Sequence, residues 1–192
     1  MKLSKSQKIW IGVGIVALVL VLWVWGSYNG LVNSDEKVNE KWANVQSAYQ
    51  RRADLIPNLV ETVQQYAAHE KDVFTAVTAA RASIMSAKTP AQLQAADNQL
   101  TSTLKTLFAV AENYPNLKAN ENFLSLQDEL AGTENRIKTE RDIFNSAVKE
   151  MNIKVRRFPT NIIAGAFGFE KKEMFEADAG AETAPIVEEL FD

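Results

Sequence analysis

The chain has 192 residues, with 24 acidic and 21 basic side chains, one histidine and no cysteine. Its formal net charge is −3, and leaving out the three N-terminal lysines gives −6 from Ile9 onward. An acidic chain is a poor ligand for nucleic acid, so no nucleic-acid partner is expected. Without cysteine it forms no disulfide and carries no thiol nucleophile. Few glycines and prolines among many Ala, Leu, Glu, Gln and Lys residues favour an all-α fold.

The first predicted element is a transmembrane anchor over residues 9–27. From Ile9 to Trp25, seventeen consecutive residues include no charged residue, Asn, Gln or Pro. A helix of this length extends about 26 Å, close to the ~30 Å thickness of the hydrocarbon core. Trp10 and Trp23 lie near its two ends, where membrane interfaces favour tryptophan. The alternative is a cleaved signal peptide, whose apolar region is usually only about 7–15 residues and ends in small residues.

Lysines around this segment predict its orientation. Lys2, Lys5 and Lys8 lie in a short basic N-terminus, residues 1–8, whereas only two lysines occur in the twenty residues after Ser27. Positive charge is preferentially retained in the cytoplasm. We therefore expect a single-pass protein of the cell membrane with a cytoplasmic N-terminus and an extracytoplasmic helical domain.

The helical domain is predicted over residues 28–175, and its first helix carries apolar residues at spacings of three and four. The segment Asn33-Ser34-Asp35-Glu36 resembles a capping box. The first helix either starts there or continues from the anchor without a break. Trp42 lies on its apolar stripe and is expected to be mostly buried.

Prolines predict where the following helices begin and end. Pro57 is expected to cause a reversal, because its ring clashes with the preceding helical turn, and Asp54 is then the cap of a second helix. The segment Thr89-Pro90-Ala91-Gln92 combines an N-cap, a proline at the first helical position and a reciprocal glutamine. It begins the third helix, which Tyr114-Pro115 closes.

The fourth helix is predicted from about Asn120 to Phe158, with a period near 3.5 that is typical of coiled coils. The apolar segment 162–169 is too short to span a bilayer and is expected to fold back on the domain. Residues 176–192 hold six acidic and no basic side chains and are expected to form a loose tail. Four such helices with short connections predict an antiparallel up-and-down four-helix bundle.

Charged residues occupy five positions of the helix stripes where an apolar residue is expected. We call this set the charged seam: Arg52, Glu70, Arg81, Glu134 and Arg141. We interpret it as a structural layer that fixes how the helices align, with Arg52 pairing with Glu134 or Glu70. The alternative is a cleft in the bundle that binds a ligand or a partner's helix.

No catalytic, cofactor-binding or metal site is predicted. The single histidine, His69, follows Tyr66 by three residues and does not supply the Glu-x-x-His pairs of a di-metal bundle. The expected function is a non-enzymatic scaffold or adaptor that binds the lipid bilayer and a membrane or envelope protein. The alternative is a ligand sensor or hydrolase that uses a cleft lined by the charged seam.

Five segments resemble the LemA family: YNGLV at 28–32, KWANVQSAYQRRADLIPNLV at 41–60, YAAHE at 66–70, YPNLKANENFLSLQDELAGTENRI at 114–137, and RDIFNSAVKEMN followed by Phe158-Pro159. The resemblance covers nearly the whole chain after the anchor. It implies a bacterial protein with one N-terminal transmembrane helix, a four-helix up-and-down domain and no assigned activity. Phe144 and Met151 stand where the family pattern leads us to expect tyrosine.

Overall fold

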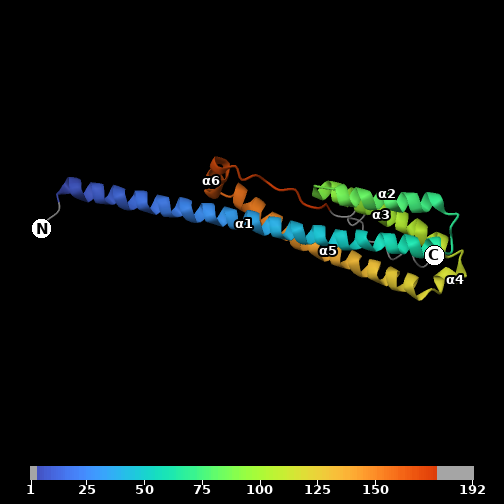
Figure 1. Cartoon of the computed structure of the whole chain (residues 1–192). Helices are drawn as coiled ribbons and strands as arrows, with labels where there is room; N and C mark the ends of the chain where they lie inside the picture. Colours follow the sequence, from blue (N-terminus) through green and yellow to red (C-terminus); the bar gives the residue numbers. More distant parts are fainter. Residues whose placement is uncertain (1–3, 177–192) are drawn as a thin grey trace, which may run out of the picture. The chain divides into compact units, whose positions relative to one another are not determined.

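A computed structural model describes residues 4–176, which are helical apart from the connections between helices and the last few residues (Figure 1). The all-α class is therefore confirmed for this part of the chain. The predicted acidic tail lies outside the described residues, except for Glu176. The helices of the described part are α1 Lys5–Gln64, α2 Lys71–Ser86, α3 Pro90–Ala111, α4 Pro115–Lys118, α5 Glu121–Arg156 and α6 Thr160–Phe167.

The helices divide between two compact units. The first, here called the α1–α5 unit, contains the residues up to Leu55 together with Ser125–Glu173. Of the described residues, the second, the α2–α3 unit, contains Ile56–Leu124 and residues 174–176. The antiparallel four-helix bundle over residues 28–175 stays a prediction.

α1 is one helix of 60 residues. It runs through the predicted domain boundary at residues 27 and 28, so the first helix of the domain continues the apolar segment without a break. The Ser34 hydroxyl donates to the carbonyl of Gly30, one turn earlier, at 3.0 Å. The segment that resembles a capping box is therefore an interior turn of α1 and does not begin a helix.

Pro57 also lies inside α1, so the predicted reversal and the role of Asp54 as a helix cap are wrong. A proline in a helix interior costs about 3 kcal/mol. Ile56, Leu59 and Val63 are at most 1 % exposed, and their spacing keeps them on one face only while the helix continues. Burying each side chain contributes about 1.5–3 kcal/mol. The three together outweigh the proline, and α1 ends at Gln64 instead.

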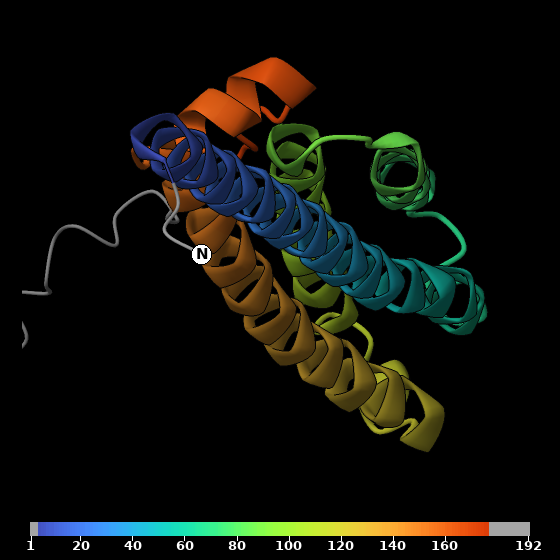
Figure 2. The same cartoon turned by 90° about the vertical axis from the view of Figure 1, so that its left-hand side faces the viewer.

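The core of the α1–α5 unit lies between α1 and α5, which run side by side (Figure 2). Trp42 is half-buried, less than a core residue, and its ring centroid is 5.4 Å from that of Phe144. The period of the predicted fourth helix places Phe158 last on its apolar stripe. Phe158 is nevertheless 76 % exposed, because α5 ends two residues earlier. The buried apolar residues of the pair are Leu31, Val38, Val45, Ala48, Tyr49, Ala53, Leu130, Ile137, Phe144, Ala147, Val148 and Met151.

The α2–α3 unit is built on a hairpin of α2 and α3 (Figure 1). Spacing in the sequence predicts an apolar stripe on α3, and all six of its residues are buried, which confirms this prediction: Leu93, Ala96, Leu100, Leu104, Leu107 and Ala111. Phe108 packs on Phe123 with ring centroids 6.1 Å apart. The buried residues of the hairpin are Phe74, Val77, Ala80, Ile84, Leu93, Ala96, Asp97, Leu100, Leu104, Leu107 and Ala111.

The predicted start of α3 is confirmed. Pro90 is the first helical residue, and the Thr89 hydroxyl accepts a hydrogen bond from the backbone N–H of Gln92 at 3.2 Å. The Gln92 carboxamide accepts in return at 3.0 Å from the N–H of Lys88, one residue before the cap. Both partners of the box therefore satisfy backbone donors that the helix itself leaves without acceptors.

Thr89→Ala is expected to lower the free energy of unfolding by about 1 kcal/mol, because it removes the acceptor for an N-terminal N–H. Thr89→Ser keeps that acceptor and is the control, with an expected change of at most a few tenths of a kcal/mol. Urea denaturation of the full chain in detergent, followed by far-UV circular dichroism, measures both. Equal losses for the two variants would contradict the role of the hydroxyl.

Candidate functional site

A polar groove of about 550 Å³ lies on the α1–α5 unit. Its residues recur at spacings of three and four on each helix, so they form one face of α1 and one face of α5. We call it the polar groove, and it is lined by Asn44, Ser47, Ala48 and Arg51 of α1 and by Glu129, Gly132, Thr133, Arg136 and Glu140 of α5.

The groove is open because small residues lie where the two helices face it. Ala48 and Gly132 contribute little or no side chain. A Cβ atom built on Gly132 meets no atom within 4 Å. Space therefore remains that a leucine or isoleucine at these positions would fill.

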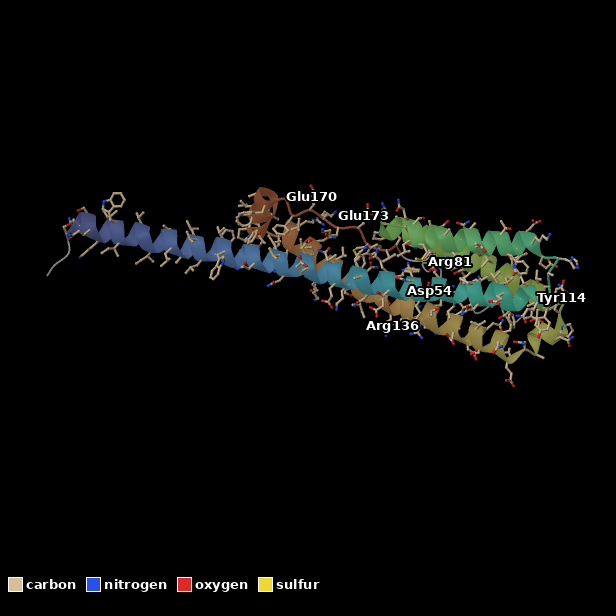
Figure 3. All side chains as sticks on the ribbon, viewed as in Figure 1. Asp54, Arg81, Tyr114, Arg136, Glu170 and Glu173 are labelled. Atoms are coloured by element: carbon tan, nitrogen blue, oxygen red, sulfur yellow. The ribbon has the colours of Figure 1, made fainter. Side chains whose placement is uncertain are left out.

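Charged residues of both signs line the groove. Glu140 is buried, with its side chain 7 % exposed, and its carboxylate accepts from the guanidinium of Arg136 at 2.7 Å. The Arg136 side chain, labelled in Figure 3, is 71 % exposed. The ion pair therefore extends from the buried carboxylate to the solvent. A buried carboxylate without such a partner is costly. Arg51 and Glu129 add one further charge of each sign.

The lining therefore contains two guanidinium groups, two carboxylates, the amide of Asn44 and the hydroxyls of Ser47 and Thr133. The two hydroxyls donate to backbone carbonyls of their own helices. The four charges sum to zero, since two are positive and two negative. Such a surface complements a segment or ligand that carries both charges. Within residues 4–176, no cluster of three His, Asp or Glu side chains is arranged to hold a metal ion.

Gly132→Ala is expected to stabilise the protein by about 1 kcal/mol, because alanine is favoured over glycine in a helix interior by that amount. The added methyl group meets no atom within 4 Å, so no clash offsets this gain. Thermal unfolding of the full chain in detergent measures it. A destabilised Gly132→Ala variant would mean that the groove is closed in solution.

Of the charged seam, the structure brings Arg52 and Glu134 together. The Arg52 side chain is 3 % exposed, and its guanidinium lies 3.7 Å from the carboxylate of Glu134. Glu134 is 62 % exposed. This geometry combines a buried cation with a solvated acid at the outer limit of an ion pair.

The other seam residues are distributed over both units. Arg141 is half-buried on α5 in the α1–α5 unit. In the α2–α3 unit, Arg81 is half-buried on α2, and Glu70 precedes α2 and accepts from the hydroxyl of Tyr114 at 3.4 Å. No seam residue is among those that line the polar groove. The interpretation of all five as one layer stays a prediction.

The sequence leads us to expect that His69 is a partly exposed helix residue. It is exposed, but it lies in the connection between α1 and α2 and not on a helix. The neighbouring Tyr66 hydroxyl accepts a hydrogen bond from the Asn120 carboxamide at 3.1 Å. This contact links two segments that carry the LemA resemblance, YAAHE and YPNLKAN, within one unit.

One exposed ion pair of the α1–α5 unit lowers the pKa of its glutamate. Lys37 donates to Glu150 at 2.8 Å. This hydrogen bond and the lysine's charge hold the pKa of Glu150 below its ordinary value. The resulting stabilisation is present above the unfolded-state pKa and is lost as the pH falls through the lowered value. Because both side chains are exposed, it contributes little to stability.

Sequence reasoning missed the groove residues Arg51, Arg136 and Glu140. In the sequence they lie one or two positions from seam residues. The pattern that could have identified them is the recurrence of small and charged residues at helical spacing on both α1 and α5. That signal becomes specific only when α1 is known to pair with α5.

Together these features define the class: a helical protein whose first helix begins with an apolar segment long enough to cross a membrane by length and composition. The LemA family profile matches residues 41–188, and the chain belongs to the LemA family. The family resemblance of the YPNLKAN and RRADLIPNL segments is thereby confirmed.

Curated relatives match over most of their length. Magnetosome proteins MamQ 1 and MamQ 2 of Paramagnetospirillum magneticum are each 26 % identical over 203 aligned residues, covering 92 % of this chain and 74 % of theirs. Protein LemA of Metamycoplasma hominis is 22 % identical, covering 86 % of this chain and 74 % of its own. The similarity thus includes the N-terminal part that precedes the family match.

Proposed function

We propose that the protein is a single-pass membrane protein anchored by residues 9–27, with the domain of residues 28–175 outside the cytoplasm and residues 176–192 as its tail. The observation that carries the anchor is the exposed apolar surface of α1. Val16, Leu18 and Val21 are 60 %, 59 % and 64 % exposed. Each Å² of apolar surface left in water costs roughly 25 cal/mol. A bilayer removes that cost over the whole segment.

The domain then acts as a non-enzymatic scaffold or adaptor, and the polar groove is its docking site. The occupant we propose is a polar helix or extended segment of a membrane or envelope protein that carries both acidic and basic side chains. It is supported by Arg51 and Glu129, which add one charge of each sign beside the Arg136–Glu140 ion pair, so a partner of mixed charge complements the groove.

Photocrosslinking in intact membranes tests the docking site. Glu129 is exposed and lines the groove, whereas Ala131 is exposed about 200° around the same helix. A photoreactive residue at Glu129 is expected to capture one defined membrane or envelope protein that Ala131 does not. Gly132→Leu, which fills the groove, should abolish that capture. Equal products from both positions would reject the groove as the docking site.

Protease accessibility tests the orientation. In spheroplasts, or in intact cells that lack an outer membrane, added protease is expected to digest the domain after Tyr28 while the membrane stays closed. Protection until the membrane is opened would reverse the orientation. The measurement does not depend on whether the groove binds a partner.

A second candidate, a sensor of a small polar ligand, is favoured by the groove volume, which falls in the ~300–1,000 Å³ range of small-molecule sites. A zwitterionic ligand such as an amino acid matches the paired charges. It should raise the melting temperature of the full chain and not that of Gly132→Leu. No shift with any of the common amino acids would argue against the sensor and leave the adaptor.

A further inference from the structure

α6 exposes apolar side chains that the rest of the domain leaves uncovered. Ile163 and Ala164 are buried against the α1–α5 unit. In contrast, Ile162 is 58 % exposed, Phe167 is 56 % exposed, and Phe158, just before the helix, is 76 % exposed. Ile162 and Phe167 lie about 140° apart around the helix, so α6 exposes one apolar side chain near each of its ends. Ile163 and Ala164, between them in the sequence, are buried.

α6 lies directly beside the end of the apolar segment of α1. The Phe167 ring centroid is 4.9 Å from that of Tyr28, and the Phe169 ring is 6.0 Å from it. An apolar hollow of about 400 Å³ is lined jointly by α1 and α6, including Trp25, Tyr28 and Phe167. The exposed apolar surface of α6 is therefore continuous with the surface proposed to face lipid.

The chain on either side of α6 holds it in this position. α5 leads into it, and Gly168, with φ 75°, ends it in the left-handed conformation that glycine adopts without strain. Beyond this turn, Asn152 of α5 and the backbone of Lys172 exchange two hydrogen bonds, at 3.0 and 2.9 Å. The Lys172 ammonium also lies 2.9 Å from the carboxylate of Asp35 on α1.

Basic residues flank the exposed apolar side chains of Phe158, Ile162 and Phe167. Arg156 and Arg157 are exposed at the end of α5, and Lys171 is exposed after α6. No acidic residue occurs from residue 151 to residue 169. Glu170 and Glu173 lie in the segment that follows α6 (Figure 3). This arrangement resembles interfacial helices, in which apolar side chains enter the acyl boundary and basic ones bind lipid phosphates.

We propose that α6, with Phe158, lies in the headgroup boundary of the bilayer that the apolar segment of α1 crosses, and that its flanking arginines bind anionic lipid. The proposal rests on the proposed anchor. The occupant it names is the lipid surface, because the exposed Phe167 of α6 adjoins Trp25 and Tyr28 at the end of the span, where interfacial aromatic residues are expected. A second copy of the chain on this surface is the competing outcome.

The absence of cysteine makes the test direct, because a single introduced thiol is labelled alone. Full-length Val19→Cys, Ile162→Cys and Ile143→Cys are each coupled to an environment-sensitive fluorophore and reconstituted into phosphatidylcholine vesicles containing a minority of phosphatidylglycerol. Val19 lies within the span. Ile143 is exposed on α5, roughly 20 Å along that helix from Arg156. Nitroxide-labelled lipids then report contact with the bilayer.

The expected result is strong quenching at Val19 by deep nitroxides, strong quenching at Ile162 by shallow nitroxides, and several-fold weaker quenching at Ile143 by either. Quenching at Ile162 no greater than at Ile143, with Val19 quenched, overturns the proposal for α6 and leaves the anchor intact. Absence of quenching at Val19 overturns the anchor itself. A blue shift at Ile162 that grows with protein density without lipid quenching assigns the surface to a second copy.

The arginines have their own readout. Replacing both in Arg156→Gln/Arg157→Gln is expected to reduce quenching at Ile162 in vesicles that contain phosphatidylglycerol and to leave quenching at Val19 unchanged. In vesicles of phosphatidylcholine alone, the double variant and the parent should agree. An equal loss in both kinds of vesicle would overturn the assignment of the arginines to anionic lipid.

Discussion

Phe144→Ala is expected to lower the free energy of unfolding by about 3–5 kcal/mol, as truncation of a buried aromatic side chain does. Phe144 is 3 % exposed in the core between α1 and α5, and it packs on the ring of Trp42. The truncation leaves a cavity and removes this ring contact. Pulse proteolysis of the full chain in detergent measures the loss, because it reports cleavage within the domain while the apolar segment stays in the micelle.

The neighbouring Ile143 is the matched control. It is 41 % exposed on the same turn of α5, so Ile143→Ala is expected to cost less than about 1 kcal/mol, as surface substitutions usually do. Similar losses at the two positions would mean that α5 does not present Phe144 to α1 in solution. Phe144→Tyr restores the residue type that the family pattern led us to expect, and it tests whether the core admits a hydroxyl there.

Arg52→Ala is expected to destabilise the protein by roughly 3 kcal/mol, because it removes a long buried side chain and leaves a cavity. Only 2 % of Arg52 is exposed. The carboxylate of Glu134, 3.7 Å from the Arg52 guanidinium, is mostly in solvent, so Glu134→Gln should cost under about 1 kcal/mol. The same proteolysis assay compares the two variants.

A double-mutant cycle on Arg52 and Glu134 separates burial from pairing. The two losses should be nearly additive, with a coupling energy below about 1 kcal/mol, since an exposed acid keeps its hydration. A loss for Glu134→Gln as large as that for Arg52→Ala would instead support the ion pair as the stabilising element of the charged seam.

Local signals in the sequence predicted the helices well where chain geometry leaves few alternatives. Thr89 and Pro90 fix the start of α3, because one supplies a cap and the other tolerates only the first turn. Leu100 and Leu107 are buried as their spacing predicted. The apolar segment of α1 and the return of α6 to the domain were likewise readable from composition and length.

Two features depended on tertiary contacts. Pro57 carries a strong local signal for a break, but burial of Ile56, Leu59 and Val63 favours one helix, and that burial is visible only in the fold. The polar groove requires the face of Arg51 to lie opposite the face of Arg136, although the two are far apart in the sequence. The sequence shows the charged seam, because its residues are charged at positions where apolar residues are expected. The residues that line the polar groove are different ones.

The continuity of α1 connects its apolar segment to its groove face by uninterrupted helix. A helix advances about 100° per residue, and α1 contains no joint between Trp25 and Leu31 in which a rotation is lost. One residue inserted between Trp25 and Leu31 would rotate Leu31 by about 100° relative to the apolar segment. The groove face of α1, which follows Leu31 in the sequence, would rotate by the same angle. An insertion of seven residues, roughly two turns, would restore the original azimuth at a greater height. The number of residues between Trp25 and Leu31 therefore sets the azimuth of the groove face of α1 relative to the apolar segment.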